Sequence, residues 1–280
     1  MNDATAPPVR GSGFGELPRR ILSTAVLAPA ALAAAYFGPP YFTVLILSGA
    51  LVLAFEWGSL CGGARLAGPA WLLFPAVAGP VAIDALAPGA AVVAVAAIAL
   101  GALVVLAAGR LVGARQPGWL AAGVLYIGLP ALALLWLRAE TDAGRAVVLW
   151  LFGVVWATDI GAYLAGRALG GPRFAPRISP KKTWAGVVGG IAAAALVSAL
   201  AAWATGVPFG IVAAGAGLAV AAEAGDLMES AVKRHFGVKD MSHIIPGHGG
   251  LFDRVDGLLI AAPCAALALY LSEGTIFPWR

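Results

Sequence analysis

The feature that most constrains this chain is a series of long apolar runs, separated by short breaks that contain Gly, Pro or charged residues. A helix needs about 20 mostly apolar residues to cross the hydrocarbon core of a bilayer. Charged residues make up only 11% of the chain, against about 25% in a typical soluble domain. The sequence therefore predicts an all-α, polytopic transmembrane helical bundle with about nine spans. Their approximate ranges are 20–37, 41–61, 69–87, 89–109, 118–137, 145–168, 184–205, 207–229 and 254–272.

The positions of Lys and Arg support this number of spans, because positively charged loops stay on the cytoplasmic side of a membrane. With a cytoplasmic N-terminus, all but three of the 18 Lys and Arg residues fall in segments on the inner side. The exceptions are Arg138, Arg145 and Arg280. One miscounted span early in the chain would destroy this alternation. We therefore expect a multi-pass protein of the inner (plasma) membrane with a cytoplasmic N-terminus.

The chain divides into a tail and two groups of helices. We expect residues 1–19, rich in Pro and Gly, to form a disordered cytoplasmic tail. Arg19 and Arg20 could instead open a cleaved signal peptide. The following run is long enough to span and many spans come after it, so an uncleaved first helix is simpler. Helices within 20–143 are expected to serve as a scaffold and in dimerisation, and 144–280 to form the catalytic helices with their cytoplasmic loops.

Acidic side chains gather at the cytoplasmic ends of three predicted helices in the second half of the chain. Ionisable residues in membrane helices are costly and usually face the bundle interior or a wet cavity. Glu223 and Asp226 are three residues apart, and so are Asp253 and Asp256. This spacing places both carboxylates of each pair on one face of a helix. Two such pairs at one end of a bundle suit Mg²⁺, which prefers a few carboxylates together with substrate phosphates. The five acidic residues are Asp159, Glu223, Asp226, Asp253 and Asp256.

Basic and hydroxyl side chains lie in the two long inner loops, beside the acidic residues. They suit phosphate binding, although basic residues there could also be anchors for anionic lipid headgroups. The candidates are Ser179, Lys181, Lys182, Thr183, Lys233, Arg234, Lys239 and Arg254. Between them, a Gly-rich turn with His248, Gly249 and Gly250 can bring backbone N–H groups close to an anion. Carboxylates for metal and cations for phosphate are what metal-assisted phosphoryl or nucleotidyl transfer requires.

Other interpretations fit the sequence less well. A secondary transporter would also bury carboxylates, but its charges should gather near the midplane rather than at the inner end. A purely structural membrane protein would not need five buried acids. The three histidines have no spacing that forms a helical pair for zinc. Glu56, near the inner end of the second run, has no partner nearby in sequence and is a lesser candidate. No feature indicates nucleic-acid binding.

The stretch from Ser230 to Asp256 resembles the signature of phosphatidate cytidylyltransferases, the CDP-diacylglycerol synthases. It contains Lys233-Arg234, Lys239-Asp240, His248-Gly249-Gly250 and Asp253-Arg254-Val-Asp256, and no fixed position of the signature is missing. The runs Trp156 to Tyr163 and Ser179 to Gly186 are also similar to that family. The resemblance covers roughly the C-terminal half, whereas the N-terminal half resembles the family only as a run of membrane helices.

The resemblance implies transfer of CMP from CTP to phosphatidic acid, giving CDP-diacylglycerol and pyrophosphate, at the cytoplasmic side of the membrane. It implies a homodimer that depends on Mg²⁺, with two cations of which the second is possibly different. Asp226 and Asp253 would be the main metal ligands, supported by Asp256 and Asp159. The catalytic residues would be Asp226, Asp253, Lys182 and Lys233. The phosphates of CTP and lipid would be held by Ser179, Lys181, Lys182, Lys233 and Arg254. An alternative from the same chemistry is a CTP-dependent kinase of a membrane lipid alcohol such as a polyprenol.

Overall fold

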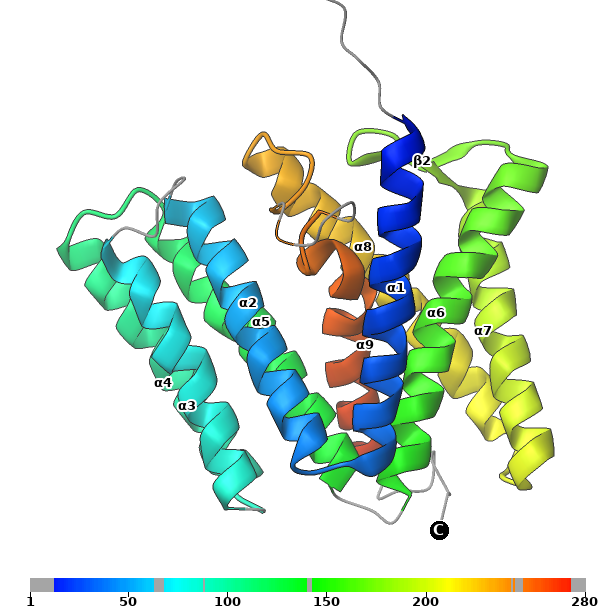
Figure 1. Cartoon of the computed structure of the whole chain (residues 1–280), viewed down its shortest axis with the longest axis horizontal. Helices are drawn as coiled ribbons and strands as arrows, with labels where there is room; N and C mark the ends of the chain where they lie inside the picture. Colours follow the sequence, from blue (N-terminus) through cyan, green and yellow to red (C-terminus); the bar gives the residue numbers. More distant parts are fainter. Residues whose placement is uncertain are drawn as a thin grey trace, which may run out of the picture.

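The computed structural model describes residues 13–62, 68–87, 89–139, 143–242, 244 and 249–272. Within these ranges the chain forms a bundle of α-helices with one short hairpin (Figure 1). The helices are α1 (Gly13–Phe37), α2 (Tyr41–Gly62), α3 (Leu73–Leu86), α4 (Ala91–Leu111), α5 (Pro117–Ala139), α6 (Gly144–Leu169), α7 (Trp184–Thr205), α8 (Gly210–His235) and α9 (Phe252–Leu271). A 3₁₀ helix, η1 (Gly68–Leu72), precedes α3. The predicted all-α bundle is confirmed.

Seven of these helices, α2 and α4 to α9, are long and apolar enough to cross a membrane. Where the structure describes the side chains, the apolar stretch of α1 covers 25–37 and that of η1 with α3 covers 70–86, both shorter than the seven. The third run, predicted as one span over 69–87, is divided into η1 and a 14-residue α3. The first helix begins at Gly13, seven residues before its predicted start. The remaining starts and ends agree with the predicted ranges to within three residues, except that α8 continues to His235, six residues beyond its predicted end at 229.

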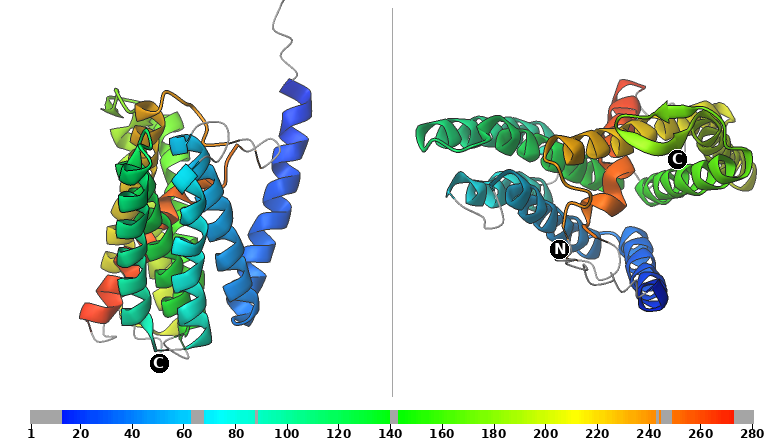
Figure 2. Two further views of the ribbon diagram at one scale, coloured as in Figure 1. Left: turned by 90° about the vertical axis from the view of Figure 1, so that its left-hand side faces the viewer. Right: turned by 90° about the horizontal axis from the view of Figure 1, so that it is seen from above.

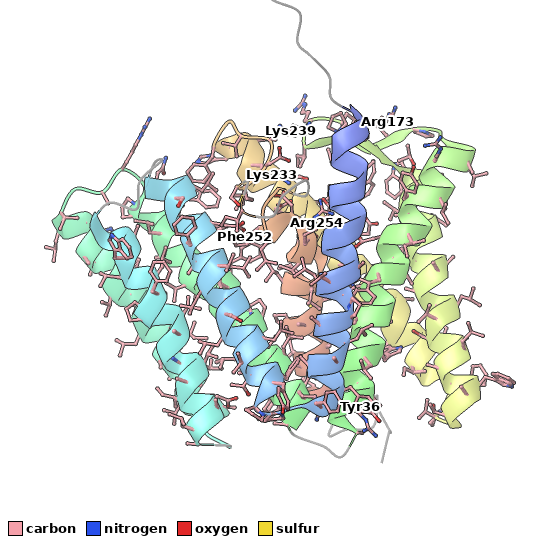
Figure 3. All side chains as sticks on the ribbon, in the orientation of Figure 1. Tyr36, Arg173, Lys233, Lys239, Phe252 and Arg254 are labelled. Carbon is pink, nitrogen blue, oxygen red and sulfur yellow. The ribbon has the colours of Figure 1, made fainter. Side chains whose placement is uncertain are left out.

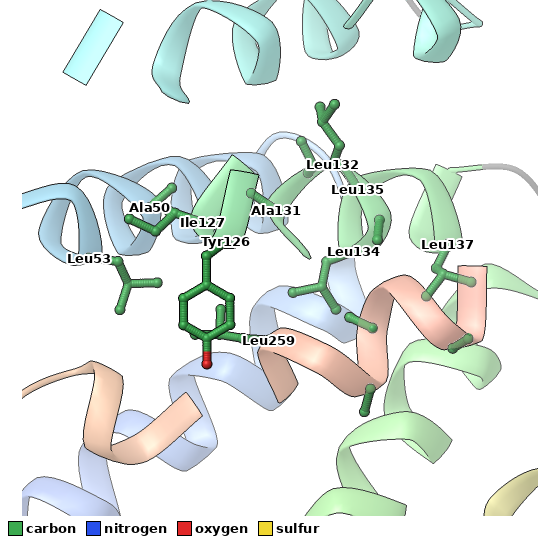
Figure 4. Packing of buried hydrophobic residues seen from close by; sticks show 14 of the residues in the cluster. Ala50, Leu53, Tyr126, Ile127, Ala131, Leu132, Leu134, Leu135, Leu137 and Leu259 are labelled. Atoms are coloured by element: carbon green, nitrogen blue, oxygen red, sulfur yellow. The ribbon is translucent and has the colours of Figure 1, made fainter. Parts of the chain in front are cut away.

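Helix α5 occupies the middle of the N-terminal group. It is the most buried of the seven long helices, because 78% of its apolar stretch lies inside the protein. It packs against α2, α3, α4, α6 and α9. Figure 4 shows this core, in which Tyr126 points from α5 toward α9 near Leu259. The ring of Tyr126 also stacks on Phe252 at 5.8 Å between centroids. Helix α1 lies at the edge of the bundle, against α2 and α6 (Figure 2).

A short hairpin, which the apolar pattern does not predict, connects α6 to α7. Strand β1 (Arg173–Ala175) pairs antiparallel with β2 (Ser179–Thr183). Thr183 ends the hairpin and caps α7, because its hydroxyl oxygen accepts a hydrogen bond from the backbone N–H of Gly186 at 3.1 Å. Phe174 packs edge-on against Trp184 with centroids 4.6 Å apart. The hairpin therefore places β2 directly at the N-terminal end of α7.

Close backbone contacts draw the last four helices together, because small residues let helix backbones approach closely. A Cβ atom on Gly161 of α6 would lie 2.7 Å from the backbone oxygen of Gly189 in α7. A Cβ atom on Gly225 of α8 would collide with the backbone oxygen of Asp256 in α9. Glycine is thus required where α8 meets α9, and this close approach brings the acidic residues of the two helices to one place.

Candidate active site

Three carboxylates from α8 and α9 form a group suited to a cation. Oxygen atoms of Asp226, Glu229 and Asp256 all lie within 4.8 Å of one another. Asp226 and Glu229 are three residues apart on α8, so they share a face of that helix. Asp256 approaches them from the first turns of α9, beside the contact that Gly225 permits. We call Asp226, Glu229 and Asp256 the acid triad.

Lys182, the fourth residue of β2, lies against one side of the acid triad. Its Nζ atom is 2.6 Å from Oε2 of Glu223 and 2.8 Å from Oδ2 of Asp226. Burial works against the charged form of Lys182, but the carboxylates of Asp226 and Glu223 outweigh it, so the pKa of this lysine is raised above its ordinary value. The hairpin thus holds an ammonium group, ionised at neutral pH, next to the triad.

Lys233 makes the corresponding contact on the other side of the triad. Its Nζ atom is 2.6 Å from Oε2 of Glu229 and 2.7 Å from Oδ1 of Asp253. An ammonium group has three N–H donors, and two carboxylates use two of them. On both lysines, the contacts that the structure describes therefore leave one donor for a phosphate oxygen.

Asp253 lies beside the triad rather than within it. Besides Lys233, its carboxylate accepts hydrogen bonds from the backbone N–H groups of Gly250 at 2.9 Å and Met241 at 3.3 Å. In this arrangement Asp253 fixes the loop that enters α9. Its predicted role as a main metal ligand stays a prediction.

Asp159 of α6 faces the same cluster from a third helix. It interacts electrostatically with Asp256, Asp226 and Lys182, although none of its oxygens belongs to the triad. Six carboxylates therefore surround the two ammonium groups of Lys182 and Lys233. Of these six, Glu223 and Glu229 are buried, and an excess of negative charge in a partly buried cluster is costly, so the cluster favours bound cations.

The other predicted phosphate-binding residues lie at the same end of the molecule, but at different depths. Figure 3 shows Arg173, Lys233, Lys239 and Arg254 toward the end where α1 begins, and Tyr36 at the opposite end. The exposed members of the predicted group are Lys181, Arg234, Lys239 and Arg254. Ser179 is partly buried in β2, and Thr183 is buried with its oxygen committed to the cap of α7. Gly249 and Gly250 precede α9, while His248 lies outside the described residues.

Sequence reasoning missed two acidic residues of this region. Glu229 carries the same three-residue spacing from Asp226 as Asp256 does from Asp253, and that spacing could have identified it. Glu56 was only a lesser candidate, yet it is completely buried and accepts hydrogen bonds from residues 186 to 196 positions away. No local pattern could reveal partners at that distance.

The triad has the donor set that Mg²⁺ requires, because hard cations take oxygen ligands. Oε1 of Glu229 is buried and has no hydrogen-bond partner among the described residues, and the same holds for the hydroxyl of Tyr126. Tyr126 interacts electrostatically with Asp256, Glu229 and Asp226. A buried polar atom without a partner is costly. A hydrated cation bound to the triad would satisfy the free oxygen of Glu229.

Comparison with known proteins gives a consistent result over nearly the whole chain. The profile of a family described as the cytidylyltransferase family matches residues 18–272. A phosphatidate cytidylyltransferase of Brucella suis biovar 1 is 38% identical over 277 residues, covering 94% of this chain and 95% of the relative. One from Brucella melitensis biotype 1 has the same identity and coverage. A phosphatidate cytidylyltransferase of Rickettsia felis is 36% identical over 154 residues, covering 52% of this chain and 67% of the relative.

Proposed function

The chain belongs to the cytidylyltransferase family and is a nucleotidyltransferase, and on that premise we propose that it converts CTP and phosphatidic acid into CDP-diacylglycerol and pyrophosphate. The observation that carries the proposal is the acid triad with a lysine on each side. The names of the relatives supply the substrates. The seven long apolar helices indicate that the protein lies in a membrane, where the lipid substrate would also reside.

The proposed reaction needs no nucleophilic side chain, because the lipid phosphate is already an anion. One of its oxygens attacks the α-phosphorus of CTP, and the bond from that phosphorus to the oxygen bridging to the β-phosphate breaks. The products are CDP-diacylglycerol and pyrophosphate. The main barrier is the repulsion between two anions, so positioning and electrostatic stabilisation are the protein's contribution.

Each group of the site has a place in this scheme. Asp226, Glu229 and Asp256 would hold Mg²⁺, which would supply positive charge to offset the repulsion between the substrates and the charge that develops on the leaving group. The free donors of Lys182 and Lys233 would orient the phosphates of the two substrates. The predicted roles of Asp253 and Asp159 as further metal ligands, and of a second cation, remain part of the proposal. The acyl chains would stay in the bilayer.

We further propose that the end bearing the triad faces the cytoplasm, across the inner membrane. The support is that Arg173, Lys239 and Arg254 lie at this end, and basic segments stay cytoplasmic. CTP would then reach the site directly from the cytosol. The homodimer implied by the family resemblance is likewise a proposal, and light scattering of the purified protein in detergent would test it.

The decisive experiment supplies radiolabelled CTP and phosphatidic acid to the purified protein in detergent, with and without Mg²⁺. We expect CDP-lipid and pyrophosphate, formed only with the divalent cation. In Asp226→Asn and Glu229→Gln we expect losses of more than about 100-fold, because even partners of metal ligands are worth 10- to 100-fold. The variants should still insert and purify normally.

Two outcomes would contradict the proposal. Formation of lipid phosphate and CDP from a lipid alcohol would identify the alternative, a CTP-dependent lipid kinase. Full activity in Asp226→Asn or Glu229→Gln would remove the acid triad from the mechanism. Asp84→Asn, an acidic residue near the end of α3, serves as the matched control and should keep the wild-type rate.

A further inference from the structure

We propose that Glu56 of α2 is a positioning residue that holds the first turn of α9 in place for the reaction. The inference rests on the proposed function. It assigns to the N-terminal helices a direct part in the site, in addition to any role as a scaffold.

Glu56 is completely buried, and no other residue of α2 carries a charge. Its Oε1 atom accepts hydrogen bonds from the hydroxyl of Ser242 at 2.5 Å and from the backbone N–H of Leu251 at 2.8 Å. Its Oε2 atom accepts one from the backbone N–H of Phe252 at 2.9 Å. A buried carboxylate is expensive unless its oxygens are hydrogen-bonded, and here both oxygens are used. All three donors belong to the loop before α9 or to its first residues.

The N-terminus of α9 needs such an acceptor. The first N–H groups of a helix have no partner within the helix, and Leu251, the residue at the N-cap, provides no side-chain hydrogen bond. The positive end of the helix dipole also favours an anion at this place. Glu56 therefore caps α9 from a different helix, across almost 200 residues of sequence.

The loop is shaped to admit the Glu56 carboxylate. A Cβ atom on Gly250 would lie 2.8 Å from Oε1 of Glu56 and 3.1 Å from Oδ2 of Asp253. Asp253 binds the same turn from the opposite direction, through the N–H of Gly250. Next to these contacts, the ring of Trp57 packs on Phe252 with centroids 5.6 Å apart. The turn is thus held by two carboxylates and one aromatic contact.

A short chain of contacts leads from Glu56 to the acid triad. The backbone N–H of Phe252 donates to Glu56. The next residue, Asp253, pairs with Lys233. Lys233 in turn pairs with Glu229 of the triad. One turn further along α9, Asp256 is itself a member of the triad. Displacing the first turn of α9 would therefore move one triad carboxylate directly and loosen the lysine that holds another.

The test is Glu56→Gln, which keeps the size of the side chain but replaces one acceptor oxygen with an N–H donor that faces a backbone N–H. We expect kcat to fall roughly 10-fold or more, and the Mg²⁺ concentration for half-maximal activity to rise by a similar factor, as for other groups that orient metal ligands. The KM for CTP should change much less. Ser242→Ala removes one of the three donors and should give a smaller change in the same direction.

Cys61→Ala is the matched control, because Cys61 is buried on the same helix and is not a partner of Glu56. It should lower the melting temperature, since it leaves a cavity, but leave the Mg²⁺ dependence unchanged. If Glu56→Gln behaves as Cys61→Ala does, with lower stability and wild-type Mg²⁺ activation, Glu56 is only a structural residue and the inference is wrong. Should Glu56→Gln fail to fold, a wild-type Mg²⁺ response in Ser242→Ala would overturn the inference equally.

A readout independent of turnover separates this inference from the proposed function. Mg²⁺ that binds the folded protein should raise its melting temperature, and Glu56→Gln should need more Mg²⁺ for the same rise. Hydrogen exchange of the amides over 249–258 should be faster in Glu56→Gln than in wild type. A wild-type protein that makes no CDP-lipid would refute the proposed function, whereas unchanged exchange and an unchanged Mg²⁺-induced shift would refute the role of Glu56.

Discussion

At the scale of single residues, Lys182 shows how one side chain can belong to the fold and to the chemistry. Its ammonium group joins the end of β2 to two carboxylates of α8. Because the pKa of Lys182 is raised, its contribution to stability is fully present below the ordinary lysine value of 10.5. That contribution is lost only as the pH rises through the higher pKa of the folded state.

We predict that Lys182→Met raises the KM for CTP by roughly 10-fold or more, since a hydrogen bond to a charged group contributes about 1.5–3 kcal/mol. Wild type and variant should differ by the same factor from about pH 6 to about pH 9, because the lysine stays protonated throughout that range. Initial rates at varied CTP concentration measure both effects. Arg177→Ala, an exposed change in the turn of the hairpin, is the control. An unchanged KM in Lys182→Met would make this lysine only an anchor of the hairpin.

Several residues of the site could be predicted from sequence and others could not. Asp226, Asp256 and Lys182 stand out because charge is rare in an apolar chain, and the structure brings them together. Glu229 follows the same spacing rule and was overlooked. Glu56 could not be found in this way, because its partners are backbone N–H groups of a loop distant in sequence.

At the scale of elements, the contact between α8 and α9 controls the geometry of the triad. Gly225 packs against the backbone of Asp256, and a Cβ atom on Gly257 would lie 3.3 Å from Cβ of Ala222. Small residues at such crossings allow helix backbones to approach closely. The separation between Asp226 and Asp256 is therefore fixed by residues that carry no charge.

We predict that Gly225→Ala separates α8 from α9, destabilises the protein by about 1–3 kcal/mol and removes most of the activity. Gly217→Ala is the matched control on the same helix, because a Cβ atom there meets nothing within 4 Å. Thermal unfolding in detergent and the CDP-lipid assay measure the two effects. Equal activity of the two variants would show that the helix crossing does not control the triad.

The apolar pattern predicts the long helices well, because burial in lipid requires continuous runs of apolar residues. The start of α7 at Trp184 agrees with its predicted start. The pattern fails at the hairpin, where Arg173 to Thr183 contains few apolar residues and is held by local pairing and by the cap of α7. The apolar pattern also fails at η1, because the run predicted as one helix over 69–87 begins as a 3₁₀ helix and becomes α-helical only at Leu73.

At the scale of the whole molecule, the two ends of the bundle differ in chemistry. The labelled basic residues lie toward one end and Tyr36 lies at the other (Figure 3). The triad lies at the first of these ends, because Glu229 pairs with Lys233. At the other end, Arg138 donates to the backbone oxygen of Ala35 at 2.7 Å, and Arg145 lies over the ring of Tyr36. These two arginines are among the three that fall outside the predicted inner segments. They connect the last turn of α1 to α5 and α6.

We predict that a membrane-impermeant maleimide labels Lys239→Cys only from the cytoplasmic side and Tyr36→Cys only from the opposite side. Native Cys264 is exposed, so Cys264→Ser is the background for both variants. Labelling of intact cells, compared with inverted membrane vesicles, distinguishes the two sides. Labelling of Lys239→Cys in intact cells would place the triad away from the cytosolic pool of CTP and contradict the proposed orientation.

Each of the two lysines lies between a pair of acids, so each ammonium group offsets part of the repulsion among these carboxylates. Without these ammonium groups, the carboxylates of α8 and α9 would repel one another and force the helices apart. On the proposed function, loss of the divalent ion would therefore stop turnover before it unfolded the bundle.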